Sequence, residues 1–136
     1  MFNVQCSMFN VQCSMFNVQR SMFNVLIALG SNYHPCAHIR WASQRLSCLL
    51  SDVRLSRIIW TQDIHGTGIR YANRLMAGYT SLTADELQQQ LKAIEAETRR
   101  TKECVTIDLD LMQYDDQFYH LNDWPRPYIK KLLPDI

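Results

Sequence analysis

The sequence predicts an α+β fold, a ferredoxin-like βαββαβ sandwich with a mainly antiparallel sheet and helices on one face. Two observations carry this prediction. Short apolar segments typical of strands alternate with two amphipathic segments in the order strand, helix, strand, strand, helix, strand. The links between them are short, and a chain of 136 residues, 47% of them hydrophobic, suits one compact domain.

The first half of the chain supplies a strand, a helix and a second strand. Residues 23–29 form a β-rich apolar run that ends at Gly30. Pro35 can open a helix, and apolar residues then recur at helical spacing to about residue 50. Residues 53–60 alternate as a strand with a bulge near Arg57. The glycine-bearing loop after them, residues 61–68, contains neither of the common phosphate-binding glycine motifs.

The second half supplies a strand, a helix and a final strand. Residues 71–82 are predicted to be a strand, and Thr83 with Glu86 has the form of a capping box that opens a helix running to about residue 98. Residues 105–111 form the next strand. A turn at 114–117, a short strand at 118–120 and a helical turn at 129–133 complete the chain.

The strand at residues 105–111 alternates between two faces. Its apolar residues share one face: Val105, Ile107, Leu109 and Leu111. Its polar residues share the other: Thr106, Asp108 and Asp110. The two carboxylates then stand about 6.5–7 Å apart at Cα, a separation at which both can converge on hard cations such as Mg²⁺. The alternative interpretation is two solvent-facing aspartates on an edge strand.

Composition excludes several classes of protein. A net charge of +1 argues against a nucleic-acid partner. No apolar run reaches the roughly 18–20 residues that span a bilayer, and no signal peptide is evident, so we expect a cytoplasmic protein without a membrane partner. Five cysteines without a C-x-x-C pair fit a reducing compartment.

Residues 1–21 consist of three near-identical heptapeptides, MFNVQCS, MFNVQCS and MFNVQRS, and a partial fourth copy follows at residues 22–25. A period of seven is compatible with a short coiled-coil seam. The copies also match at polar positions, which favours duplicated coding sequence instead. We therefore expect a disordered or loosely helical extension at 1–21 and one domain at 22–136.

Two further groups of residues have open interpretations. His34 and His38 stand four apart at the start of a predicted helix, where they could bind zinc or be exposed or capping histidines. Arg99, Arg100 and Lys102 follow the second helix. They complement the helix dipole, and they also lie close in sequence to the aspartates, where a metal-bound phosphate needs cations.

Several motifs occur together in one order along the chain. They are Ala28-Leu29-Gly30-Ser31-Asn32, Trp60-Thr61 with Gly66, Tyr71-Ala72-Asn73, Ile94-Glu95 with Arg100, and Thr106-Ile107-Asp108-Leu109-Asp110-Leu111 with Tyr114-Asp115. In this combination the chain resembles the 6-hydroxymethyl-7,8-dihydropterin pyrophosphokinase family, folate-pathway enzymes that transfer pyrophosphate from ATP to a pterin alcohol.

The resemblance implies roles for ten residues. Asp108 and Asp110 would hold two Mg²⁺ ions and, with Arg100, form the catalytic set. ATP would be bound by Arg100, Lys102 and Arg126. The pterin would be bound by Thr61, Ile64, Tyr71, Asn73 and Tyr128. The resemblance implies small-molecule partners only, ATP and the hydroxymethyldihydropterin, and we expect a monomer.

The chain also departs from the family pattern. The segment between the second helix and the aspartate strand is short, and Val105 stands where the family has an arginine. The usual His-Pro element is missing, with His120 the nearest candidate, and Arg99 is a candidate replacement for the lost arginine. Two hypotheses follow: an active pyrophosphokinase, or a weak or inactive homologue that binds nucleotide and pterin as a binding or regulatory module. A ferredoxin-like module without a ligand is a third.

Overall fold

The computed structural model describes residues 22–62, 65–98 and 104–136. In chain order the elements are β1 (Phe23–Ser31), α2 (Pro35–Ser47), β2 (Ser51–Leu55), β3 (Ile59–Gln62), β4 (Arg70–Thr80), α3 (Ala84–Ala96), β5 (Asp108–Tyr114), β6 (Gln117–Phe118), α4 (Pro127–Leu132) and the 3₁₀-helix η1 (Leu133–Asp135). The predicted α+β class is confirmed. The prediction for residues 1–21 lies outside the described residues.

The strands form one six-stranded sheet in the order β2-β4-β1-β5-β6, and β3 also pairs with β4. All of these pairings are antiparallel. Strand β1 is central, with β4 on one side and β5 on the other, as the ferredoxin-like arrangement requires. The aspartate strand β5 therefore lies next to the strand that opens the domain.

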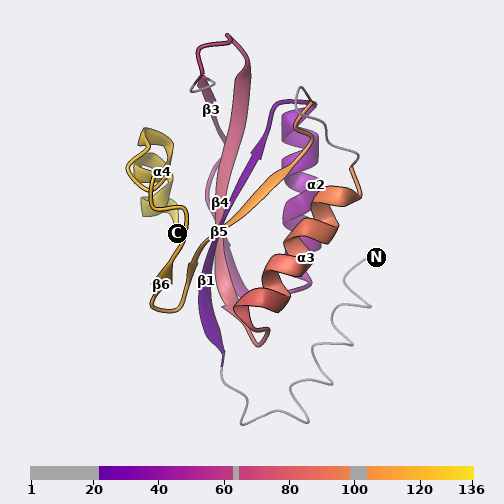
Figure 1. The fold of residues 1–136 in the computed structure, drawn as a ribbon, viewed down its shortest axis with the longest axis vertical. Coiled ribbons are helices and arrows are strands. Elements are labelled where there is room, and N and C mark those ends of the chain that lie inside the picture. Colours follow the sequence, from indigo (N-terminus) through magenta and orange to yellow (C-terminus); the bar gives the residue numbers. More distant parts are fainter. Residues whose placement is uncertain (1–21, 63–64, 99–103) are drawn as a thin grey trace.

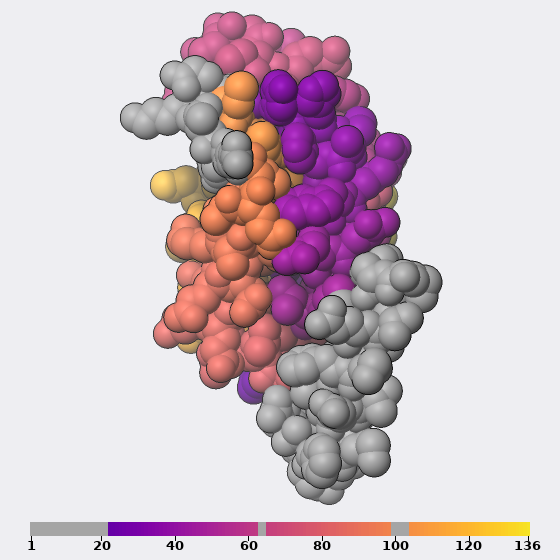
Figure 2. Space-filling view, turned by 90° about the vertical axis from the view of Figure 1, so that its right-hand side faces the viewer, coloured from indigo at the N-terminus to yellow at the C-terminus, as the bar shows by residue number. Residues whose placement is uncertain are grey.

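The helices divide between the two faces of the sheet (Figure 1). Helices α2 and α3 lie side by side over one face, which Figure 2 views directly. The two helices of the predicted βαββαβ order thus share one face, as expected, and the short helix α4 packs on the opposite face. The residues of α2 that face the sheet, such as Ile39 and Leu46, are fully buried.

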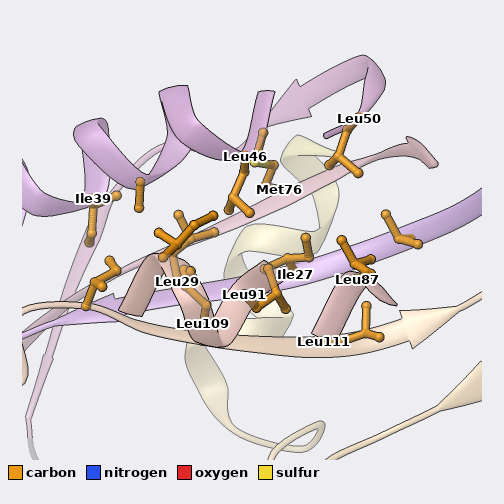
Figure 3. Close-up of a cluster of buried hydrophobic side chains, with 14 of the residues drawn as sticks. Ile27, Leu29, Ile39, Leu46, Leu50, Met76, Leu87, Leu91, Leu109 and Leu111 are labelled. Atoms are coloured by element: carbon orange, nitrogen blue, oxygen red, sulfur yellow. The ribbon is translucent and has the colours of Figure 1, made fainter. Parts of the chain in front are cut away.

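Both faces of the sheet bury apolar side chains. The core under α2 and α3 includes Ile27, Leu29, Ile39, Leu46, Met76, Leu87, Leu91, Leu109 and Leu111 (Figure 3). The cluster under α4 is Leu26, Ala28, Leu75, Ala77, Met112, Tyr128, Ile129 and Leu132. A strand covered on both faces reads as a continuous apolar run, which explains the composition of residues 25–29.

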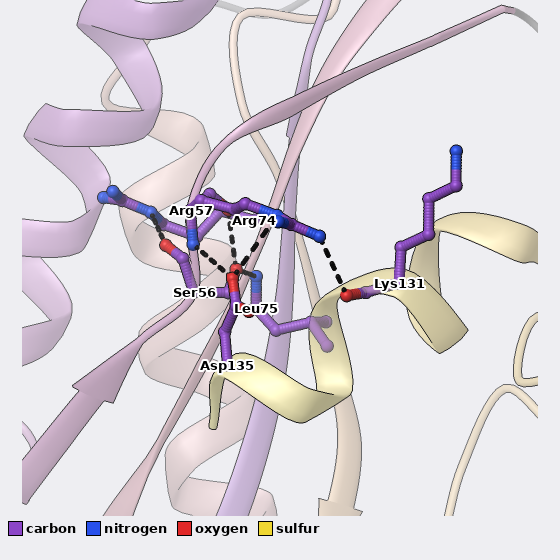
Figure 4. Close-up of polar contacts among 6 residues, drawn as sticks. All are labelled: Ser56, Arg57, Arg74, Leu75, Lys131 and Asp135. Carbon is purple, nitrogen blue, oxygen red and sulfur yellow. Dashed lines mark hydrogen bonds and ion pairs between the residues drawn. The ribbon is translucent and has the colours of Figure 1, made fainter.

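The predicted strand at residues 53–60 is two strands, β2 and β3, interrupted around Ser56 and Arg57. Ser56 keeps contact with β4, because its hydroxyl accepts the N–H of Leu75 at 2.8 Å. Arg57 instead contacts the C-terminal segment: its N–H donates to Asp135 Oδ2 at 3.0 Å and its guanidinium to the carbonyl of Lys131 at 3.3 Å (Figure 4). The interruption thus brings Arg57 into contact with both α4 and η1.

The helix starts follow the predicted chemistry. The capping box of α3 is confirmed: Glu86 N–H donates to Thr83 Oγ1 at 3.1 Å, and Thr83 N–H donates to Glu86 Oε1 at 2.9 Å. Pro35 occupies the first turn of α2. Both helices end two or three residues earlier than predicted, at Ser47 and Ala96. Among the described residues, no helix is long and apolar enough to cross a membrane.

The aspartate strand begins at Asp108, later than predicted. Ile107 and Leu109 point into the main core, as expected. The alternation predicts that Thr106 shares the face of the two aspartates, and the structure places it elsewhere. It is buried, and its hydroxyl donates to Thr98 Oγ1 at 2.6 Å just beyond α3, because the chain has not yet entered the strand.

Candidate active site

A pocket of about 200 Å³ opens on the sheet face that carries α4. Strands β1, β3, β4 and β5 and the start of α4 contribute to its walls. Its lining residues are Ala28, Leu29, Gly30, Thr61, His65, Tyr71, Asn73, Asp108, Asp110, Arg126 and Tyr128. Segments that are up to a hundred residues apart in sequence therefore meet at one site.

The two aspartates form one wall of this pocket. Asp108 pairs with Gly30 across the sheet and Asp110 with Ala28, so small residues of β1 lie opposite both carboxylates. Both aspartates are half-buried and line the pocket. The sheet geometry thus leaves open space beside the two carboxylates.

The Asp110 carboxyl lies in an unfavourable environment for its charge. Burial, and then repulsion by Asp108, raise its pKa to about 6, with smaller contributions from Glu95 and Asp123. His120 acts in the opposite direction, since its Nε2 lies 3.7 Å from Asp110 Oδ1. A bound divalent cation would relieve the repulsion between the carboxylates, and carboxylate oxygens are the ligands that Mg²⁺ prefers.

The opposite wall is polar and aromatic. Asn73 on β4 is buried, and its side-chain N–H donates to Thr61 Oγ1 on β3 at 2.7 Å. Tyr71 lies two residues before Asn73 on the same strand and pairs with Thr61. Gly30 lies between Asn73 and Asp108 in the ladder, and a Cβ there would stand 3.3 Å from Asn73 Oδ1. The absence of a side chain at Gly30 keeps the amide accessible from the pocket.

The start of α4 contributes Arg126 and Tyr128 to the lining of the pocket. The Arg126 guanidinium lies 4.9 Å from the centre of the Tyr128 ring, and Arg126 Nη1 is 3.8 Å from Asp123 Oδ1. Tyr128 is buried, and this burial raises its pKa to about 12, so its phenol stays protonated at neutral pH. The C-terminal segment therefore brings one cation and one neutral aromatic hydroxyl to the site.

Seven of the ten predicted site residues line this one pocket. They are Thr61, Tyr71, Asn73, Asp108, Asp110, Arg126 and Tyr128. The other three, Ile64, Arg100 and Lys102, lie outside the described residues, as does Arg99. Their placement therefore stays a prediction.

Two features of the site were not predicted from the sequence. His65 lines the pocket, although no pattern in its loop distinguishes residues that turn inward. Asp123 lies with Asp110 and His120 in a group whose ligand atoms are all within 4.8 Å of one another. In the described part of the chain this is the one group of three or more potential metal ligands, and neither His34 nor His38 belongs to it.

Val105 has a structural position outside the pocket walls. It is buried, its N–H donates to Asn32 Oδ1 at 2.8 Å, and its carbonyl accepts the Asn32 N–H at 2.9 Å. The Ser31 hydroxyl also donates to that carbonyl, at 3.3 Å. Val105 thus connects the turn after β1 to the start of β5.

A family model described as 7,8-dihydro-6-hydroxymethylpterin-pyrophosphokinase (HPPK) matches residues 26–135 of the chain. The chain belongs to this family. The match includes every residue that lines the pocket, and it excludes the heptapeptide repeats. A comparison with curated proteins returned no match. HPPK membership assigns the chain, at the level of the family, to the pyrophosphokinases of folate biosynthesis.

Proposed function

We propose that this chain is a Mg²⁺-dependent enzyme that transfers pyrophosphate from ATP to 6-hydroxymethyl-7,8-dihydropterin and releases AMP. One observation supports this most directly: the paired aspartates, the polar pair Asn73 and Thr61, and Arg126 line the same pocket. Such a pocket offers a cation site, a site for a flat heterocycle and a phosphate partner within reach of each other.

The cation site is proposed to be Asp108 and Asp110, which would hold two Mg²⁺ ions. The donor set fits this ion, because it consists of hard oxygens whose mutual repulsion a divalent cation would offset. When bound, Mg²⁺ would supply positive charge that offsets the negative charge developing on the transferred phosphate groups. The aspartates themselves orient the ions and contribute no covalent step.

The pterin site is proposed to be the polar wall. An amide such as Asn73 both donates and accepts, as a pterin ring edge requires, and Thr61 holds that amide in place. Tyr71 and Tyr128 offer aromatic surface on either side, and Ile64 is a further proposed contact. In this arrangement the 6-hydroxymethyl oxygen faces the aspartate wall.

The reaction is proposed to be a direct in-line transfer. A bond forms between the pterin hydroxymethyl oxygen and the β-phosphorus of ATP, and the hydroxyl proton is released to solvent. The bond from that phosphorus to the oxygen bridging to the α-phosphate breaks, leaving AMP. Arg126 would hold phosphate oxygens from the α4 side, with Arg100 and Lys102 as further proposed cations. Catalysis then consists of positioning and electrostatic stabilisation.

The experiment is to measure AMP release from ATP with purified full-length protein. We expect AMP only when Mg²⁺ and hydroxymethyldihydropterin are both present, and a loss of at least a hundredfold in Asp108→Asn. Asp116→Asn, which removes a carboxylate from the exposed turn before β6, is the matched control. Release of AMP at the same rate without pterin, or full activity of the Asp108→Asn protein, would contradict the proposal.

A second candidate function is that of a binding or regulatory homologue. Val105 favours it, because this buried apolar residue stands where the family resemblance implies an arginine. Calorimetry that detects nucleotide and pterin binding without AMP release would support this candidate. Turnover at an ordinary enzymatic rate would exclude it.

A further inference from the structure

Glu95 is a buried carboxylate in the last turn of α3 to which the proposed reaction gives no role. Only 9% of the residue is exposed, and it lies among the buried residues of the helix together with Leu91 and Ile94. A buried carboxylate is costly unless hydrogen bonds or opposite charges compensate for its desolvation. The contacts that compensate for the desolvation of Glu95 therefore indicate what this side chain does.

One of these contacts reaches the aspartate strand. Glu95 Oε2 accepts the backbone N–H of Leu109 at 2.7 Å, and the contact is buried. Leu109 is the residue between Asp108 and Asp110. A hydrogen bond to a carboxylate in a buried environment is short and stronger than one between neutral groups. Glu95 thus holds the backbone at the midpoint of the proposed cation site.

The pairing of β5 explains why this bond is needed. On one side β5 pairs with β1, but on the other it pairs with β6 only at Gln113 and Tyr114. In an antiparallel strand, successive N–H groups point to opposite sides. Within the described sheet, the stretch around Leu109 has no strand along its outer edge, and Glu95 supplies the acceptor that such a strand would provide.

We propose that Glu95 is a positioning residue for the cation site: by accepting the Leu109 N–H, it fixes the strand segment that presents Asp108 and Asp110. The inference rests on the proposed function, because the two aspartates are the proposed cation ligands. It adds a residue on the opposite face of the sheet that controls how well they bind. Groups that orient metal ligands typically change affinity about tenfold to a hundredfold when they are removed.

Two conservative variants separate the hydrogen bond from the charge. Glu95→Gln keeps a side-chain oxygen at the same reach but removes the charge. Glu95→Asp keeps the charge but shortens the side chain by one carbon–carbon bond of about 1.5 Å, which breaks a 2.7 Å contact. Leu91→Ala, a buried change on the same face of α3, is the control for general loosening of the helix.

The first readout is binding of Mn²⁺ alone, followed by electron paramagnetic resonance of free Mn²⁺ with wild type and variants. We expect Glu95→Asp to weaken Mn²⁺ binding at least tenfold, and Glu95→Gln and Leu91→Ala to stay within threefold of wild type. Equal weakening by Glu95→Gln or Leu91→Ala, or unchanged affinity in Glu95→Asp, would overturn the role of Glu95. The proposed function would be overturned as well if the wild type binds no Mn²⁺, or if Asp108→Asn binds Mn²⁺ as tightly as the wild type does.

The second readout does not depend on metal. Amide hydrogen exchange of Leu109, measured by NMR in the metal-free protein, should be slow in wild type and Glu95→Gln and at least tenfold faster in Glu95→Asp. Exchange at Leu75, on the far side of β1, serves as the internal reference and should not change. Rapid exchange of Leu109 in the wild type would show that Glu95 does not hold this strand, whatever the metal measurements give.

Discussion

Replacing Asp110 by asparagine should stabilise the metal-free protein at neutral pH while it damages cation binding. The folded protein raises the pKa of Asp110 from 3.8 to about 6, chiefly through burial and the neighbouring Asp108. A raised pKa means that the fold favours the protonated carboxyl. The associated stability is fully present below pH 3.8 and is lost as the pH rises through about 6. Ionised Asp110 therefore costs stability at neutral pH.

The size of this effect follows from the difference between the two pKa values. At about 1.4 kcal/mol per pKa unit, a rise from 3.8 to about 6 corresponds to ~3 kcal/mol. About a third of the side chain is exposed (32%), and solvent screening reduces the expected value to ~1–2 kcal/mol. Asparagine has the shape of aspartate and carries no charge. The free energy of unfolding of Asp110→Asn should therefore exceed that of wild type by this amount.

The assay is urea unfolding in EDTA between pH 4 and pH 8, followed by tryptophan fluorescence. The free energy of unfolding of Asp110→Asn should exceed that of wild type by about 1–2 kcal/mol at pH 7.5, and the difference should vanish towards pH 4. Asp116→Asn, in an exposed turn, should show no such pH-dependent gain. Added Mg²⁺ should stabilise wild type more than Asp110→Asn.

A single result would refute this reasoning. If Asp110→Asn is less stable than wild type at pH 7.5 in EDTA, the Asp110 carboxylate is held by favourable contacts, such as its contact with His120, and not opposed by burial and Asp108. The two carboxylates would then not form a wall that requires a cation.

Three further predictions concern the pocket and the fold. Gly30→Ala places a methyl group 3.3 Å from Asn73 Oδ1, so steady-state kinetics should show a KM for the pterin raised roughly tenfold with the KM for ATP within twofold; equal increases in both would contradict the assignment of this wall. Thr83→Ala removes the α3 cap and should lower the free energy of unfolding by about 1 kcal/mol in urea, whereas an unchanged value would show that the capping box adds nothing. Ser56→Ala leaves the buried N–H of Leu75 without its hydroxyl acceptor and should lower the free energy of unfolding by about 1–2 kcal/mol in a thermal melt. A smaller loss than that of Thr83→Ala would argue against this contact.

Local patterns predicted the elements that depend on neighbours in sequence. The capping box at Thr83 and Glu86 forms as expected, because both partners lie within one helical turn. The aspartates share a face because strand residues alternate with period two, a property of the backbone alone. Thr106 does not follow this alternation, because it precedes the strand and its hydroxyl donates to Thr98 instead.

Long-range contacts decided features that these patterns could not indicate. At the interruption between β2 and β3, Arg57 contacts Asp135, which lies 78 residues away in the sequence. His65 turns towards the pocket in a loop whose sequence permits other conformations. Glu95 belonged to a recognised motif, yet only the packing of α3 on β5 shows that its partner is the amide between the aspartates.

By itself, the sequence determined the order of the elements, the shared face of Asp108 and Asp110 and the chemical character of the site, because these follow from backbone periodicity and residue type. Only the tertiary structure decided that α4 crosses to the opposite face and brings Arg126 and Tyr128 to those aspartates. The physical reason is that burial of apolar surface is non-directional. It favours covering the second face of the sheet, but the position of the covering helix depends on contacts between residues distant in the chain.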